Sequence, residues 1–99
     1  MNWMQTTVPH GTDPKPIRSS LFNLAMAGTA GGKLDTELAI FSREAGDQTV
    51  LLLSPRASRF AFRMPGEWVE VSEDDLKAHA WKTVYTTGVD PDELGLTEA

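Results

Sequence analysis

The fold of this chain is decided by residues 36–54, TELAIFSREAGDQTVLLLS. In an extended chain the first half divides into two sides, Leu38, Ile40 and Ser42 against Ala39, Phe41 and Arg43. The triplet at residues 45–47 interrupts this pattern, and residues 50–53 are then apolar at every position. A strand that is apolar on both faces is typical of the middle of a sheet. The stretch therefore predicts a hairpin whose second strand is central.

Residues 58–64, SRFAFRM, follow the hairpin and fit two structures. We favour a strand, which places three apolar side chains toward the core, namely Phe60, Phe62 and Met64. A helix over residues 55–64 is the alternative, since it would have a serine cap, a proline in its first turn and apolar residues at helical spacing. Both interpretations put Arg59 and Arg63 on one side, away from the phenylalanines.

Helices are predicted on both sides of these strands. Residues 17–27 have apolar side chains at helical spacing, although strand alternation also fits part of them. Residues 72–88 form the clearer helix, because Ser72 can cap it, three carboxylates occupy its first turn and Gly88 ends it. Its inward stripe would consist of Leu76, Ala80, Thr83 and Val84.

Short connections and one more strand complete the predicted chain. Residues 28–33 hold three glycines, which lower the stability of helix and strand alike and indicate a flexible connection. Pro65 and Gly66 suit the centre of a turn, and residues 67–71, EWVEV, favour a strand. A single helical turn can begin with Asp90 as its cap.

The predicted fold class is α+β, with a small antiparallel meander of three or four strands and one or two helices packed on it. Residues 1–16 indicate a proline-rich N-terminal arm, because each proline disfavours helix in the residue before it. Residues 17–88 would form a single α+β domain and residues 89–99 an acidic C-terminal tail. With 99 residues in total, the chain has room for one domain.

Composition excludes several classes of protein. The chain has no cysteine, which removes disulfides, thiolate nucleophiles and zinc–thiolate sites. The net charge of -5 is uneven, since residues 1–65 hold seven basic and five acidic side chains and residues 66–99 hold two and nine. The longest apolar run, residues 50–53, is far shorter than the roughly 20 residues of a membrane span. The N-terminal residues lack a targeting pattern, so we expect a cytoplasmic protein without membrane association.

No group of residues predicts catalysis. A nucleophilic site needs a base that an orienting group holds in place, and the two histidines are His10 in the arm and His79 on a helix flank. Glu73, Asp74 and Asp75 are consecutive, so on a helix they point about 100° apart and cannot converge on one ion. We therefore expect a protein that is not an enzyme, with no catalytic residue, no metal and no cofactor.

The candidate binding residues are four arginines, Arg43, Arg56, Arg59 and Arg63. The planar fork of a guanidinium suits carboxylates and phosphates. The alternative is a solvated sheet face on which these arginines pair with acids of neighbouring strands, such as Glu44.

These observations favour a small non-catalytic protein-interaction module, such as a regulator, inhibitor or accessory subunit, that acts by surface and charge complementarity. The alternative is a binder of nucleic acid or a phosphate ligand through Arg56, Arg59 and Arg63, although the negative net charge disfavours nucleic acid. An acidic mimic of nucleic acid is a third hypothesis. The expected partner is another protein, and an open sheet edge or opposed charged patches would also allow a homodimer.

Overall fold

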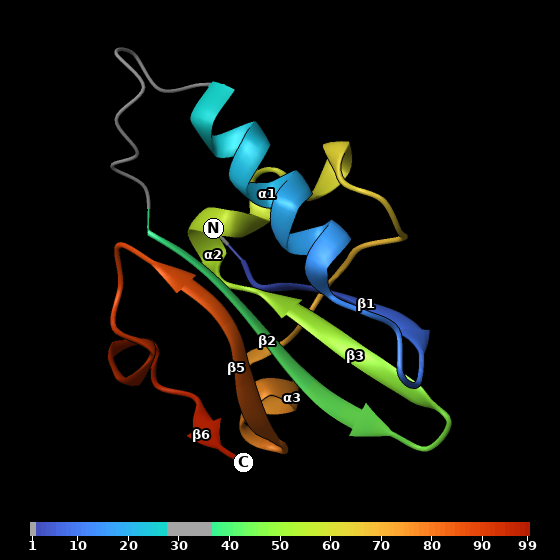
Figure 1. Ribbon diagram of the computed structural model, residues 1–99. Helices are drawn as coiled ribbons and strands as arrows, with labels where there is room; N and C mark the ends of the chain where they lie inside the picture. The colour runs from blue at the N-terminus through green and yellow to red at the C-terminus, as the bar shows by residue number, and fades with distance from the viewer. Residues whose placement is uncertain (1, 28–36) are drawn as a thin grey trace.

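A computed structural model describes residues 2–27 and 37–99 as a sheet with helices on both faces (Figure 1). The six strands follow the order β4-β1-β3-β2-β5-β6. Their bounds are β1 Met4–Pro9, β2 Leu38–Ala45, β3 Gln48–Leu53, β4 Val69–Glu70, β5 Ala80–Thr87 and β6 Thr97–Glu98. The helical segments are α1 Lys15–Ala27, α2 Pro55–Ser58 and α3 Glu73–Lys77, with the 3-10 turns η2 Ala61–Arg63 and η3 Pro91–Leu94.

The sheet has a buried core on each face. The first core lies under α1, α2 and η2, and Leu21 and Leu53 belong to it. The second core lies on the opposite face, under α3 and the C-terminal segment, and includes Leu52, Leu76 and Trp81. Because β2 and β3 contribute to both cores, these two strands organise the whole molecule.

The hairpin predicted from residues 36–54 is present as β2 and β3. Ala45 pairs with Gln48, so Gly46 and Asp47 form the turn. Gly46 has φ 65, a value that glycine adopts without strain. The prediction of a central strand is confirmed, since β3 lies between β1 and β2.

The N-terminal segment differs from the predicted arm, because residues 4–9 form β1 inside the sheet. β1 pairs with β3 along its whole length, from Met4 opposite Leu53 to Pro9 opposite Gln48. The prolines do not interrupt this ladder: Pro9 ends the strand, and the other two lie at the start of α1, where a backbone donor has no helical partner.

The helix predicted over residues 17–27 is confirmed as α1, which begins two residues earlier. It buries Ile17, Leu21 and Ala25, four residues apart, against the first core. The Oδ1 atom of Asp13 accepts a hydrogen bond from the backbone N–H of Lys15 at 2.9 Å. The glycine-rich connection predicted at residues 28–33 lies outside the described residues.

The segment after β3 is helical, so the favoured strand over residues 58–64 is wrong. α2 and η2 bury three side chains at the spacing of the alternative helix, Ala57, Ala61 and Met64. Ser54 precedes α2, but its hydroxyl does not cap the helix. Instead, it accepts a hydrogen bond from the backbone N–H of Ala39 at 3.1 Å. This bond ties the start of the segment to β2.

The helix predicted over residues 72–88 is wrong beyond its first turns. Its start is confirmed, since the Ser72 hydroxyl accepts a hydrogen bond from the backbone N–H of Asp75 at 3.2 Å. α3 then ends after five residues. The indole N–H of Trp81 donates to the carbonyl of Leu76 at 3.1 Å and satisfies a group that the ended helix leaves free.

The second half of the predicted helix is strand β5. Residues 83–87 are all β-branched or aromatic, which favours a strand, and the strand gives β2 its second neighbour. Ala80, predicted to face inward, is exposed. β5 contains a bulge, because Ile40 pairs with Tyr85 while Phe41 pairs with Thr83, which leaves Val84 as an extra residue.

The α+β class is confirmed, although the sheet is larger than a meander of three or four strands. It is also mixed, since β6 runs parallel to β5 with Ala80 opposite Thr97. The strand predicted over residues 67–71 is present as the short β4. The turn predicted after Asp90 is present as η3, whose first free backbone donor, Asp92 N–H, bonds the Asp90 carboxylate at 3.0 Å.

Candidate functional site

Three of the four candidate arginines lie in the same short helical segment as an exposed phenylalanine. Phe62 lies in η2 and is 85% exposed, and Arg63 follows it in the same turn. Arg56 belongs to α2, and Arg59 follows that helix. All four side chains are exposed. We name this set, Arg56, Arg59, Phe62 and Arg63, the arginine–phenylalanine turn.

The predicted inward position of Phe62 is wrong, because a helical backbone distributes its side chains differently from a strand. Ala61 and Met64 take the inward positions and leave Phe62 outside. The guanidinium of Arg59 lies over the ring of Phe60, 4.7 Å from its centroid. The expectation that Arg59 lies away from the phenylalanines is therefore also wrong. Such a contact at an exposed site contributes about 0.5–1 kcal/mol.

Arg56 forms a long ion pair with Glu37. The Nε atom of Arg56 lies 3.8 Å from a carboxylate oxygen of Glu37, and both side chains are more than half exposed. Pairs of this kind contribute about 0–1 kcal/mol. Arg56 can therefore exchange this carboxylate for another at little cost.

Arg43 does not join the other three arginines. Its guanidinium lies 5.3 Å from the ring centroid of Trp81, a member of the second core, whereas α2 and η2 cover the first. Glu44, expected to pair with one of these arginines, bonds His10 and Thr49 instead. The sheet separates Arg43 from the arginine–phenylalanine turn.

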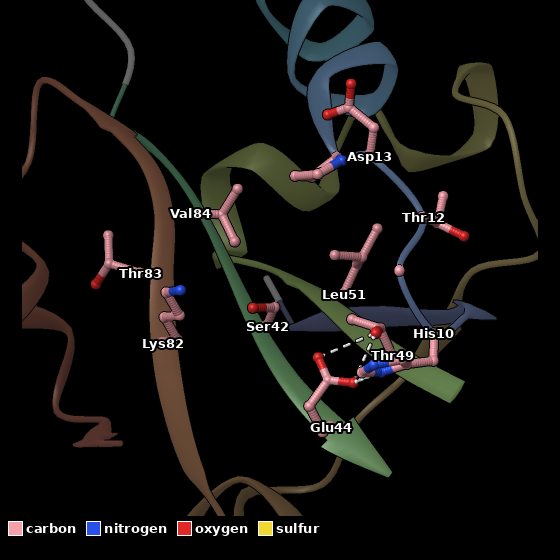
Figure 2. Close-up of a pocket in the computed structure, with 12 residues that line it drawn as sticks. His10, Thr12, Asp13, Ser42, Glu44, Thr49, Leu51, Lys82, Thr83 and Val84 are labelled. Carbon is pink, nitrogen blue, oxygen red and sulfur yellow. Dashed lines mark hydrogen bonds and ion pairs between the residues drawn. The ribbon is translucent and has the colours of Figure 1, made fainter. Parts of the chain in front are cut away.

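A polar cleft of about 500 Å³ opens between the β1–α1 connection and the first-core face of β2 and β5 (Figure 2). One side of the cleft carries a chain of hydrogen bonds. The Nδ1 atom of His10 donates to the carboxylate of Glu44, which also accepts a hydrogen bond from the Thr49 hydroxyl at 3.0 Å. Lys82 lies on the β5 side of the cleft.

The hydrogen bond from His10 is the main reason that the pKa of Glu44 lies below its ordinary value. The bond from Thr49 and the positive charges of His10 and Lys82 lower the pKa further, while partial desolvation opposes them. Glu44 and His10 are both more than half exposed, unlike the desolvated groups of most active sites. Their pair ties the β1–α1 connection to the hairpin.

Sequence reasoning placed His10 in the arm and missed this chain of contacts. The contact between Glu44 and Thr49 could have been predicted from the sequence, because a two-residue turn sets these positions opposite each other. The contact of His10 with Glu44 could not be predicted, since the position of His10 depends on the pairing of β1 with β3. That pairing brings the backbone N–H of His10 to the carbonyl of Asp47 at 3.0 Å.

Within residues 2–27 and 37–99, no helix combines the length and the apolar character that crossing a membrane requires. In the same part of the chain, histidine and acidic side chains form no group of three that could hold a metal ion. No family model, curated protein or solved structure matches this chain. Its function is therefore inferred from the surfaces described above.

Proposed function

We propose that this chain is a small non-catalytic protein-interaction module, a regulator, inhibitor or accessory subunit, that docks through the arginine–phenylalanine turn. The observation that carries this proposal is the 85% exposure of Phe62, against 57% for Val69 and 41% for Phe22. Full burial of a phenylalanine side chain contributes about 1.5–3 kcal/mol. Among the large apolar side chains of the described residues, Phe62 therefore gains most from a partner.

The neighbours of Phe62 indicate the chemistry of that partner. Arg59 and Arg63 place positive charge on either side of the ring in the sequence. Aromatic residues and arginines supply most of the binding energy in protein interfaces. The expected partner is a protein surface with an apolar pocket that accepts Phe62 and carboxylates around its rim.

The base of the turn is held by buried contacts, which reduces the entropy lost on docking. The Ser58 hydroxyl lies 3.1 Å from the carbonyl oxygen of Leu53 and 2.9 Å from that of Ser54, and can donate to either. Ala57 is fully buried beside them. The exposed residues thus stand on a segment that is anchored before any partner arrives.

A photo-cross-linking residue in place of Arg63 would identify the partner in a lysate, and calorimetry with the purified partner would then test the proposal. We expect Phe62→Ala to weaken binding about thirtyfold, the factor that corresponds to a loss of roughly 2 kcal/mol. Phe22→Ala is the matched control, because Phe22 is also exposed but lies on α1. Equal affinities for wild type and Phe62→Ala would overturn the proposal. A cross-link between two copies would indicate the predicted homodimer.

Single-stranded nucleic acid is the second candidate, because bases can stack on Phe62 while arginines bind phosphates. The net charge of -5 works against it. A fluorescent oligonucleotide titrated at low and at physiological salt separates the two candidates. Binding at physiological salt that Phe62→Ala abolishes would favour nucleic acid over a protein partner.

A further inference from the structure

The strands β2 and β5 diverge at one end and leave a recess between them. Their pairing stops at Ser42 and Lys82, after which β2 continues beside β3 alone and the start of β5 pairs with β6. We name the place where they separate the β2–β5 fork. A recess of about 390 Å³ lies there, and its basic lining residues are Arg43, His79 and Lys82.

Trp81 positions two of these three basic side chains. The ring of Trp81 is 2% exposed and is fixed by its hydrogen bond to Leu76. Arg43 lies over this ring, and the imidazole of His79 meets it edge-on, with 6.4 Å between centroids. His79 thus lies in the α3–β5 connection and not on the flank of a long helix, as the sequence predicted.

Arg43 has a hydrogen-bonding group without a partner in the described part of the chain. Its Nε atom is buried, and no group of residues 2–27 and 37–99 forms a hydrogen bond with it. Among the described residues no carboxylate forms an ion pair with its guanidinium. Buried donors in folded proteins are almost always paired, so an unpaired one calls for an explanation.

The acidic side chain in the lining of the recess is already engaged. Both carboxylate oxygens of Glu44 accept hydrogen bonds from Thr49, and one of them also bonds His10. These partners line the polar cleft on the other side of Glu44 and not the recess. Ala99 also lines the recess with the carboxyl end of the chain, but among the described residues neither Arg43 nor Lys82 forms an ion pair with it or with Glu44.

We propose that the β2–β5 fork binds the phosphate group of a small ligand through Arg43, His79 and Lys82. A guanidinium presents a planar fork of donors that matches phosphate oxygens. A phosphate group carries about -1.5 to -2 charge at pH 7 and three acceptor oxygens, so it can use donors from three directions. A carboxylate has fewer oxygens and a single charge, and it would leave part of this site unused.

The test is a titration of the full chain with inorganic phosphate at constant ionic strength, observed by ¹⁵N NMR. The arginine Nε–H signal of Arg43 and the indole N–H signal of Trp81 should move in a saturable manner. Methyl phosphate should act in the same way if the natural ligand is a phosphate ester, and it should bind more weakly if free phosphate is the ligand. Acetate should give no saturable shift.

Variants show whether the three basic residues cause the effect. We expect Arg43→Gln and Lys82→Gln to weaken phosphate binding about tenfold each, as the loss of a charged hydrogen bond predicts. Lys82 is exposed, so Lys82→Gln keeps the test valid if Arg43→Gln fails to fold. Lys15→Gln is the matched control, because Lys15 is also an exposed lysine but lies at the start of α1, and this variant should bind phosphate normally.

Three results would overturn the proposal. The first is a shift that rises linearly without saturation, and the second is an equal response to acetate. The third is a loss of binding in Lys15→Gln together with normal binding in Lys82→Gln. The experiment is independent of the docking surface, because Phe62 and its arginines lie over the opposite core.

Discussion

Two aromatic residues of this chain stand beside arginines in opposite settings. Trp81 is 2% exposed and fixes Arg43 above its ring, whereas Phe62 is 85% exposed and has Arg63 beside it in a turn. In the first region the core packs around the ring of Trp81, and the guanidinium of Arg43 lies over that ring. In the second region the ring of Phe62 is exposed to water. The same two residue types therefore suit a small charged ligand in one place and a partner surface in the other.

Replacement of the two aromatic side chains should give the largest difference between the regions in the free energy of unfolding. Trp81→Ala removes a buried side chain and its hydrogen bond, so we expect a loss of about 3–5 kcal/mol in the free energy of unfolding. Phe62→Ala should change the same quantity by less than about 0.5 kcal/mol, because the ring lies in water. Urea denaturation followed by circular dichroism measures both. Similar losses in the two variants would contradict the comparison.

A smaller effect is expected at the base of the exposed region. Ser54→Ala removes the hydroxyl that accepts a hydrogen bond from the buried N–H of Ala39, which should lower the free energy of unfolding by about 1–3 kcal/mol. Because this bond ties α2 to β2, hydrogen exchange in α2 and η2 should quicken as well. Thr7→Ala, on the exposed side of β1, is the control and should alter neither. Unchanged exchange would show that the bond does not anchor the turn.

The smallest change in the free energy of unfolding should come from replacing Glu44, which is next to Arg43 in the sequence. Its pKa is lowered in the folded chain, so its ionised form stabilises the fold above the ordinary value of 4.5, and that contribution disappears as the pH falls through the lowered pKa. Glu44→Gln should therefore be slightly less stable than wild type at pH 7, and this difference should disappear as the pH falls through the lowered pKa of Glu44. Thermal unfolding at a series of pH values checks this.

The Glu44→Gln variant also tests whether Glu44 interacts with Arg43. If Glu44 serves His10 and not Arg43, the Nε–H signal of Arg43 should be the same in Glu44→Gln and in wild type. A large change in that signal would mean that Glu44 neutralises Arg43.

The parts of the fold that depend on neighbouring residues were predictable. The β2–β3 hairpin follows from a strict alternation around a glycine turn, and the caps Ser72 and Asp90 follow from short side chains before acidic residues. β1 and β5 were not predictable in this way, because each is a strand owing to a partner far along the chain. The segment from Ala80 to Lys82 suits a helix, and only β2 and β6 select the strand.

For the candidate sites too, what could be predicted is what depends on residues close together in the sequence. Arg56, Arg59 and Arg63 lie within eight positions, so any local structure keeps them close together. Arg43 was grouped with them on the assumption that residues 58–64 form a neighbouring strand. That segment instead packs on the first core, whereas Arg43 lies on the opposite face of the sheet, beside Trp81 of the second core. Its contact with Trp81 joins residues 38 positions apart, which no local pattern indicates.

The bulge at Val84 accommodates one residue of β5 that has no partner in β2. Before the bulge Trp81 faces the second core, and after it Tyr85 packs against the first. Deletion of Val84 would leave a regular ladder in which Ile40 still pairs with Tyr85 and Phe41 with Thr83, so Trp81 would stay beneath Arg43 and His79. Substitutions at Val84 leave that alternation unchanged. Relatives of this chain that keep the fork should therefore vary at this position, both in the residue and in whether one is present.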